Sequence, residues 1–429
     1  MAKEIKKVNI ALLGLGTVGG GTYDILTKNR EMILKTQGVD ICVTKVLDKS
    51  KDLVIKRGIP KADACDNIDE ILNDKSISIV VETIGGIEPA KSFIEKSLNA
   101  GKSVVTANKE LISKHWKDLE PLARKNGVGL YFEASCAGGI PIIRVLQQGM
   151  QANNIKQIMG IVNGTTNYIL TKMTEQNLPY KDVLLEAQSL GFAEADPTAD
   201  VEAYDAMYKL SILSSLAFHT AVPFTSIYRE GITSISADDI QNAKNLGYII
   251  KLLAIGKKND GNIEARVHPC FVPISHPLAS VRNEFNAVFL SGDSVDDIML
   301  YGRGAGSYPT GSAVVSDIVF ASKADNHFSV SFEVTDKVAK DINMVTDFES
   351  AYYISLSVVD KAGVLSKITD KFGQNSVSIS QMVQSSAKDG YAKLVFLTHT
   401  TTEKSLQTAL KQIKELAEVK SADSVIRVI

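Results

Sequence analysis

The chain has 429 residues, enough for two or three domains, with 22% charged residues and a formal net charge of −2. So balanced a charge gives no reason to expect binding to nucleic acid or a membrane surface. No apolar run is long enough to span a bilayer, and the start lacks the apolar core of a signal peptide. The four cysteines are too scattered for a zinc site or a disulfide framework. We therefore expect a cytoplasmic protein.

The first motif is a glycine-rich turn between an apolar strand, residues 8–13, and a helical segment that reaches about residue 37. Its Gly-x-Gly-x-x-Gly spacing, between a strand and a helix, is the fingerprint of dinucleotide binding. The glycines let backbone N–H groups approach a pyrophosphate, which then lies on the helix N-terminus. A turn chosen only for tight packing is the alternative. The expected cofactor contacts in this turn are Gly14, Gly16, Thr17, Val18 and Gly19.

The second strand, residues 41–47, ends in Asp48. An acid at this point usually binds the adenosine ribose of NAD, whereas a nearby basic residue accommodates the extra phosphate of NADP. Lys49 and Lys51 follow Asp48 directly. Both cofactors therefore remain open.

Further strands at residues 78–81, 103–106 and 130–132 alternate with helices, which indicates a parallel sheet wound on both faces. Ligands of such sheets bind beyond the carboxyl ends of the strands. Lys109 lies just past one of these ends and is a candidate for the site. A solvated surface lysine is the alternative.

A loop rich in small residues, 133–141, follows the strand that ends at residue 132. Such a loop brings backbone carbonyls together and, with the carboxylate of Glu133, could hold a hard cation. It could also present Cys136 as a nucleophile. We favour a small buried side chain for Cys136, because no histidine lies near it in sequence.

An acidic turn at residues 191–200 leads into an almost wholly apolar helix at 201–218. Asp205 and Lys209 are four residues apart and share one face of this helix. A buried carboxylate and ammonium are costly unless they pair or serve a ligand, and a buried ammonium suits proton exchange with an alcohol or carbonyl oxygen. A structural ion pair is the alternative, and the acidic turn just before the pair counts against it. Its carboxylates belong to Glu194, Asp196 and Asp200.

The later part of the chain predicts two more units. Strands at residues 155–162, 263–272, 285–291 and 297–301 indicate a largely antiparallel sheet with helices on one face. A second glycine-rich loop at 302–306 precedes a helix at 311–321, and residues 323–348 are polar and predict a linker. From residue 351 the order strand, helix, strand, strand, helix, strand is the ferredoxin-like arrangement.

With these stretches together, the whole chain resembles homoserine dehydrogenase of the form with a C-terminal ACT domain. The resemblance is carried chiefly by residues 191–200 with Asp205 and Lys209, and it is supported by residues 106–109, 163–168 and 302–306. That family reduces L-aspartate 4-semialdehyde to L-homoserine with NADH or NADPH. The implied fold is α/β. It has a Rossmann-like dinucleotide-binding domain at 1–150 completed by about 305–325, an α+β catalytic and dimerisation domain at 151–304, a linker at 326–349 and an ACT domain at 350–429.

The resemblance also implies roles for individual residues. Lys209 and Lys109 would handle the oxygen that changes between carbonyl and alcohol, with Asp205 orienting Lys209. The other implied contacts are Glu194, Asp200, Gly164 and Thr165 for the substrate; Thr83, Gly304 and Gly306 for the cofactor; and Glu133 with the carbonyls of Cys136, Gly138 and Ile140 for a monovalent cation, Na⁺ or K⁺.

ACT domains bind small amino acids where two copies pair, so L-threonine is the expected ligand and a homodimer or homotetramer the expected assembly. The matching loop and helix start contain Asp360, Gly363, Val364 and Leu365.

Two departures and two rival functions remain. Phe192 stands where many relatives carry an aromatic hydroxyl, and Leu47 stands before Asp48 where NADP-dependent relatives commonly carry arginine. The first rival is a phosphorylating semialdehyde dehydrogenase with Cys136 as nucleophile. The second is a non-catalytic amino-acid sensor.

Overall fold

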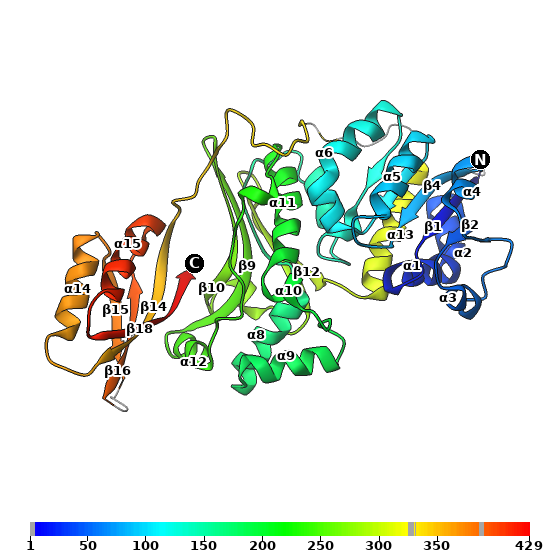
Figure 1. Cartoon of the computed structure of the whole chain (residues 1–429). Helices are drawn as coiled ribbons and strands as arrows, with labels where there is room; N and C mark the ends of the chain where they lie inside the picture. The colour runs from blue at the N-terminus through cyan, green and yellow to red at the C-terminus, as the bar shows by residue number, and fades with distance from the viewer. Residues whose placement is uncertain (1–4, 325–329, 331, 386–389) are drawn as a thin grey trace.

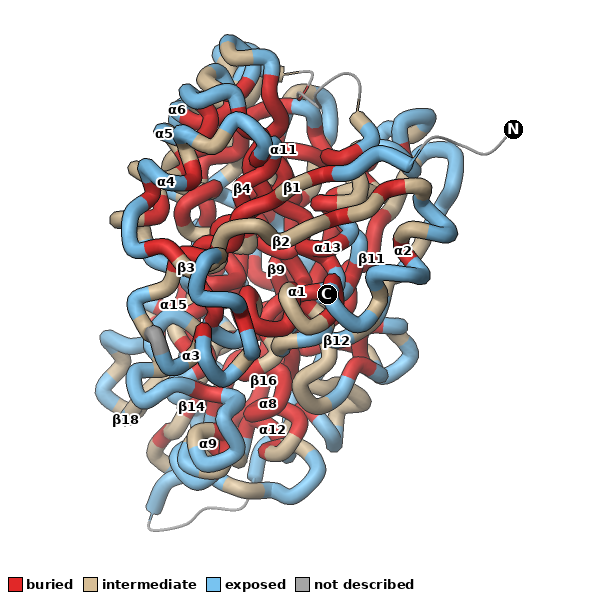
Figure 2. The backbone as a smooth tube through the Cα atoms, turned by 90° about the vertical axis from the view of Figure 1, so that its right-hand side faces the viewer, coloured by how far each residue is buried: buried red, intermediate tan, exposed pale blue. Residues whose placement is uncertain are grey.

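The computed structural model describes residues 5–324, 330, 332–385 and 390–429. Three units lie in a row in Figure 1: an N-terminal unit (residues 5–132 with α13), a central unit (133–306) and a C-terminal unit (343–429). Buried segments, red in Figure 2, run through the interior beneath exposed turns and helices.

The N-terminal unit is built on six parallel strands in the order β3-β2-β1-β4-β5-β6, which confirms the predicted Rossmann-like sheet. The predicted helix to residue 37 is two helices, because Asn29 leaves helical geometry with φ −101° and ψ 10°. The strands are β1 Lys6–Leu13, β2 Val39–Leu47, β3 Ala64–Cys65, β4 Ile77–Glu82, β5 Ser103–Thr106 and β6 Leu130–Tyr131, and the helices are α1 Thr17–Lys28, α2 Arg30–Gln37, α3 Lys51–Lys56, α4 Ile68–Asn73, α5 Ala90–Asn99 and α6 Lys109–Lys125.

Helix α13, Ser307–Lys323, returns from the central unit and packs against α1. The two helices approach so closely that a Cβ at Gly21 would lie 2.3 Å from the backbone oxygen of Ser307. The Ser307 hydroxyl also donates to the backbone oxygen of Thr17, 2.8 Å away. A segment nearly 300 residues later in sequence is therefore part of the N-terminal core.

The central unit is a mostly antiparallel sheet, β12-β11-β7-β9-β10, with helices packed on it. Strand β9 was not predicted from the sequence. Its middle is buried on both faces, so it shows no alternation of apolar and polar residues. The strands are β7 Ile155–Ile161, β8 Tyr228–Arg229, β9 Tyr248–Asn259, β10 Asn262–Pro273, β11 Phe285–Gly292 and β12 Asp296–Arg303, and the helices are α7 Ile142–Arg144, α8 Gly164–Gln176, α9 Tyr180–Ser189, α10 Thr198–Val201, α11 Tyr204–Phe218 and α12 Ala237–Asn245.

The predicted continuous helix over 201–218 is wrong at its start. Ala203 adopts left-handed geometry, with φ 62° and ψ 21°, and separates α10 from α11. The backbone N–H of Ile232 donates to the oxygen of Val201, 2.9 Å away. A neighbouring segment thus satisfies a carbonyl that an uninterrupted helix would use itself.

The C-terminal unit has the predicted βαββαβ order, and β18 joins its sheet to β10 of the central unit. The predicted polar linker is wrong in part, since Phe332 packs edge-on against Trp116 of α6 and Val330 is buried. Residues 325–329 and 331 lie outside the described residues. The elements are β13 Asn343–Met344, β14 Glu349–Val359, α14 Val364–Gln374, β15 Ile379–Gln384, β16 Tyr391–Thr398, β17 Thr401–Thr402, α15 Glu403–Lys414 and β18 Val419–Val428.

The contact between α1 and α13 leads to a first test. We expect Gly21→Ala to lower the free energy of unfolding by about 1–3 kcal/mol, because the added methyl forces two packed helices apart. Gly373→Ala is the matched control, since Gly373 lies in α14 and its Cβ would meet nothing within 4 Å. Urea unfolding followed by circular dichroism measures both. A control that loses as much stability as Gly21→Ala would contradict the packing argument.

Candidate active site

The predicted pair on α11 forms and is buried. The Nζ of Lys209 donates to Oδ2 of Asp205 at 2.7 Å and to the backbone oxygen of Val162 at 2.8 Å. Asp205 is 6% exposed and Lys209 8%. Lys109, the first residue of α6, lies with its Nζ 3.3 Å from Oδ1 of Asp205 and is half-exposed. One buried carboxylate therefore bridges two ammonium groups from different units.

The charges of this cluster depend on one another. Burial alone would raise the pKa of Asp205, but Lys209 and Lys109 outweigh it and hold that pKa below its ordinary value. The same carboxylate raises the pKa of Lys109 against the effect of burial. The pKa of Asp200 is raised, first by burial and then by the charge of Asp205. Asp205 thus stays ionised and keeps Lys109 protonated.

Asn163 links the acidic turn to this pair. Its Nδ2 donates to Oδ1 of Asp200 at 2.7 Å and to Oδ2 of Asp205 at 2.9 Å. Its Oδ1 accepts from the backbone N–H of Thr166 and so caps α8. Asn163 was not predicted as a site residue, although an asparagine before a predicted helix start is a capping signal.

Of the three carboxylates of the acidic turn, only Asp200 is linked to the Asp205–Lys209 pair, through Asn163. Asp196 instead accepts from the N–H and the hydroxyl of Thr198, the first residue of α10. Glu194 is exposed. Thr165, in the first turn of α8, donates to the backbone oxygen of Phe192 at 2.6 Å. Gly164 begins α8 and lies against the backbone oxygen of Glu284.

The glycine-rich turn lies at the carboxyl ends of β1 and β2. Gly16 is the N-cap of α1 and no side chain caps this end, which suits an anion such as a pyrophosphate. Gly19 lies against the backbone oxygen of Gly14 and the hydroxyl of Thr83. Asp48 accepts from the N–H of Leu15 at 2.5 Å, so its carboxylate lies beside the turn. Thr17 and Val18 form the first turn of α1.

Two loops cross side by side between the N-terminal and central units. The N–H of Gly139 donates to the backbone oxygen of Arg303 at 3.0 Å. Gly138 has φ 52°, and a Cβ there would lie 2.4 Å from the backbone oxygen of Gly304. Gly306, the N-cap of α13, likewise has no side-chain cap. The structure thus brings the predicted cation loop against the second glycine-rich loop.

The carboxylate of Glu133 is already engaged at the start of α7. Its oxygens accept from the N–H groups of Ile143 at 2.9 Å and Arg144 at 2.8 Å. Burial, and then Asp317, raise the pKa of Glu133 to about 7. The described residues hold no group of three or more His, Cys, Asp or Glu side chains placed for a metal ion. A cation held mainly by the backbone carbonyls of Cys136, Gly138 and Ile140 stays a prediction.

Cys136 is fully buried, and burial raises the pKa of its thiol to about 12. Its sulfur contacts the Ser135 hydroxyl and the backbone oxygen of Lys209. A thiol in this environment is not a nucleophile at neutral pH. Its place beneath Lys209 is that of a small packing residue, as the sequence favoured.

The predicted ligand loop of the C-terminal unit lies between β14 and α14. Gly363 is the N-cap of α14 with φ 87°, and no side chain caps this helix start. Val364 is buried and Leu365 packs against the core of the unit. The N–H of Asp360 donates to the backbone oxygen of Gly390.

Three family models match the chain in succession. They are described as "Homoserine dehydrogenase, NAD binding domain" for residues 14–133, "Homoserine dehydrogenase" for 141–319 and "ACT domain" for 352–418. The homoserine dehydrogenase of Bacillus subtilis (strain 168) is 39% identical over 432 residues, and the alignment covers 99% of both chains. The chain belongs to the homoserine dehydrogenase family.

Solved structures of the family agree. A homoserine dehydrogenase from Thiobacillus denitrificans superimposes with a TM-score of 0.92 at 38% identity, covering 100% of this chain and 99% of that one. A hyperthermophilic archaeal homoserine dehydrogenase in complex with NADPH has a TM-score of 0.64 at 30% identity, covering 75% of this chain and 99% of that one. Homoserine dehydrogenases are NAD(P)-dependent oxidoreductases that act on a CH–OH group, which confirms the predicted enzyme class.

Two further observations concern the C-terminal unit and the relation to membranes. The match at residues 352–418 confirms the predicted C-terminal ACT domain. Within the described residues, no helix is both long and apolar enough to cross a membrane.

Two buried polar residues, Lys251 and Asn286, were not predicted from the sequence. Lys251 is fully buried in β9 and donates to Oδ1 of Asn167 in α8 at 2.9 Å and to the backbone oxygen of Val281. Asn286 of β11 is fully buried beside Gly164 and Gly304, and its amide finds no partner among the described residues. A lone lysine or asparagine in an apolar strand gives no sequence signal of what it faces.

Lys251 predicts a pH-dependent stability. Burial lowers its pKa from 10.5 to about 7. Between these values the unfolded chain binds the proton and the folded chain does not, so stability rises with pH from about 7 to 10.5. Between pH 7 and 10, we expect the free energy of unfolding of the wild type to rise by roughly 3–4 kcal/mol more than that of Lys251→Met.

Urea unfolding at several pH values tests this, with Lys156→Met, a substitution at an exposed lysine of β7, as the control for losing one charge. Parallel pH curves for wild type and Lys251→Met would show that Lys251 stays protonated in the fold.

Proposed function

We propose that this chain catalyses the reversible NAD(P)H-dependent reduction of L-aspartate 4-semialdehyde to L-homoserine at the cluster of Asp205, Lys209 and Lys109. The observation that carries the proposal is the buried carboxylate that bridges the two ammonium groups. An oxygen that becomes an alkoxide needs a cationic proton donor held in a fixed place. Lys209, held by Asp205 and the Val162 carbonyl, meets that need, and Lys109 supplies a second, more accessible ammonium.

The substrate's own charge fits the surrounding side chains. An amino-acid ammonium requires carboxylates, and Asp200 lies half-buried beside Asn163 while Glu194 is exposed on the same turn. The polar end of the substrate would contact the start of α8 at Gly164 and Thr165. Phe192 carries no hydroxyl, but Thr165 already donates to its backbone oxygen, so this turn is held without one.

The cofactor would bind at the glycine-rich turn and the two uncapped helix starts. Uncapped N–H groups at the start of α1 fit a pyrophosphate, and Thr83 with the loop at Gly304 and Gly306 would border the cofactor. When bound, NADH or NADPH supplies the hydride. The protein's part is to orient the carbonyl and deliver the proton from an ammonium.

Three further parts of the proposal concern what surrounds the reaction. A monovalent cation, Na⁺ or K⁺, would occupy the carbonyl-rich loop after Glu133. L-Threonine would bind the C-terminal unit near Asp360 and Gly363, where the backbone at the start of α14 is uncapped. We also propose a homodimer or homotetramer located in the cytoplasm.

The assignment of Lys209 is tested by Lys209→Ala. We expect turnover in homoserine oxidation, followed at 340 nm, to fall about 10²- to 10⁴-fold, because the proton carrier of the alcohol is lost. NADH binding, measured by fluorescence titration, should stay nearly unchanged. Lys181→Ala removes an exposed lysine of α9 and controls for charge. Turnover within a few-fold of the wild type in Lys209→Ala would rule this role out.

The role of Asp48 is tested by Asp48→Ser. A carboxylate beside the turn repels the extra phosphate of NADPH, so its removal should raise the ratio of kcat/KM for NADPH to that for NADH by at least about tenfold. Asp52→Ser removes an exposed acid nearby in α3 and should leave the ratio unchanged. An equal ratio in Asp48→Ser and wild type would place the ribose contact elsewhere.

A further inference from the structure

A short segment, residues 228–232, lies between the C-terminal unit and the catalytic helix α11. It pairs with β10 through Tyr228 and Arg229, and the N–H of Glu230 donates to the backbone oxygen of Val267 at 2.8 Å. In an extended segment successive side chains point to opposite sides. Tyr228 and Glu230 contact the C-terminal unit, and Arg229 between them contacts the start of α11.

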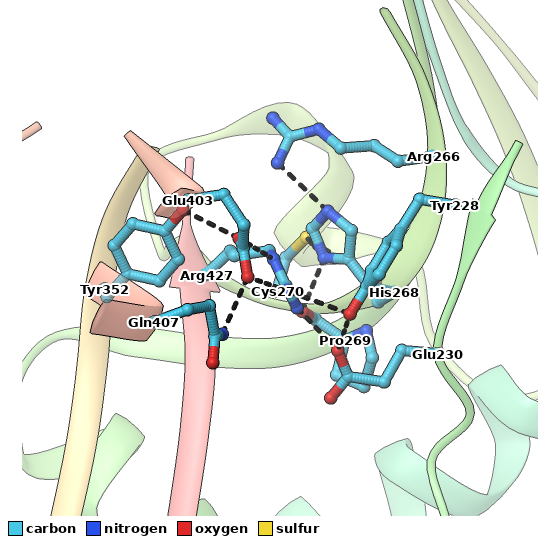
Figure 3. Close-up of polar contacts among 10 residues, drawn as sticks. All are labelled: Tyr228, Glu230, Arg266, His268, Pro269, Cys270, Tyr352, Glu403, Gln407 and Arg427. Atoms are coloured by element: carbon cyan, nitrogen blue, oxygen red, sulfur yellow. Dashed lines mark hydrogen bonds and ion pairs between the residues drawn. The ribbon is translucent and has the colours of Figure 1, made fainter. Parts of the chain in front are cut away.

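On the first side, Arg427 of β18 holds the segment. This guanidinium is 2% exposed and donates to Glu230 at 2.5 Å and to the hydroxyl of Tyr228 at 3.0 Å. It also donates to both carboxylate oxygens of Glu403 in α15, and Tyr352 donates to the same carboxylate (Figure 3). A buried charge this fully bonded has one low-energy arrangement, so the segment and the C-terminal unit are fixed to one another.

The second buried guanidinium of Figure 3 closes this cluster from the central unit. Arg266 of β10 lies 2.6 Å from a carboxylate oxygen of Glu264 and stacks on Phe348. Its Nη1 lies 3.1 Å from Nε2 of the fully buried His268. Arg427 approaches the same Phe348 ring. The interface is thus a packed, charged layer rather than a loose contact between two domains.

On the other side, the 228–232 segment contacts the residues around Ala203, where α10 ends and α11 begins. The guanidinium of Arg229 lies 3.6 Å from the ring centroid of Tyr204, the first residue of α11, and donates to the backbone oxygen of Glu202. Gly231 packs so closely that a Cβ there would lie 2.4 Å from the backbone oxygen of Val201. The next residue after Tyr204 is Asp205, so these contacts fix the start of the helix turn that carries the catalytic pair.

We propose that Arg229 is a positioning residue for Asp205 and Lys209, and that Arg427 of the C-terminal unit controls its position through Glu230. A ligand that shifts β18 would then move the 228–232 segment and, through Tyr204 and Glu202, the start of α11. This inference rests on the proposed catalytic roles of Asp205 and Lys209. It gives the regulatory unit a direct contact route to the reaction, through two adjacent residues that face opposite ways.

A double-mutant cycle tests the route in the full-length protein. Arg427→Met and Arg229→Met should each lower kcat for homoserine oxidation about fivefold, with KM for the cofactor unchanged. Because both residues act on the same segment, kcat of the double variant should fall no further than kcat of the more impaired single variant. Losses that multiply would show independent effects and overturn the route.

Two variants separate positioning from general damage. Arg427→Lys keeps the charge and should recover part of the lost kcat. Lys393→Met removes another ion pair between the C-terminal and central units, with Asp238 of α12, and should leave kcat unchanged. An equal loss in Lys393→Met would mean that any weakening of the interface lowers activity, which contradicts a specific route. If Arg427→Met does not fold, Gly231→Ala, which pushes the segment from the other side, replaces it in the cycle.

Amide hydrogen exchange provides a readout that does not need catalysis. Peptides covering residues 198–210 should exchange faster in Arg427→Met than in wild type or Lys393→Met, because the start of α11 loses its support. Unchanged exchange there would overturn the proposal even if activity falls. Faster exchange combined with full activity of Lys209→Ala would leave the coupling standing and refute the catalytic assignment instead.

Discussion

The structure depends most on one buried carboxylate that is shared by two ammonium groups. Burying Asp205 without partners would cost several kcal/mol, so the fold must bring Lys209 and Lys109 to it. Lys209 lies on the same helix as Asp205, so bringing the two side chains together costs little additional conformational entropy. Lys109 comes from the N-terminal unit, so the ion cluster forms only when two units are packed together. Packing of the N-terminal unit against the central unit therefore also assembles the ion cluster of the proposed active site.

Elements far apart in sequence meet at this cluster for reasons of backbone chemistry. Asn108 and Asn163 each cap the helix whose first turn carries a site residue, Lys109 in α6 and Thr165 in α8. Helix α11 starts only because Ala203 breaks the chain in left-handed geometry. Helix starts therefore carry most of the predicted polar contacts, and the buried body of α11 serves to hold one of them in place.

The sequence predicted those parts that repeat a local rule. The Gly-x-Gly-x-x-Gly turn, the strand ends with Asp48 and Lys109, and the i,i+4 spacing of Asp205 and Lys209 are all readable within a few residues. The break at Ala203 was not, because it is set by Ile232 and Gly231 from a separate segment. Strand β9 was missed because burial on both faces removes its alternation. The partners of Lys251 and Arg427, and the buried surroundings of Asn286, likewise depend on tertiary contacts that no spacing encodes.

The paired loops at Gly138 and Gly304 have a mechanical consequence. The chain passes between the N-terminal and central units at residues 133–141 and again at 303–306, and these two passages lie against each other and share a hydrogen bond from Gly139 to Arg303. The backbones of the two passages therefore restrain one another at this spot. A side chain at position 138 would press on the backbone oxygen of Gly304, so one enlarged residue would disturb both connections at once.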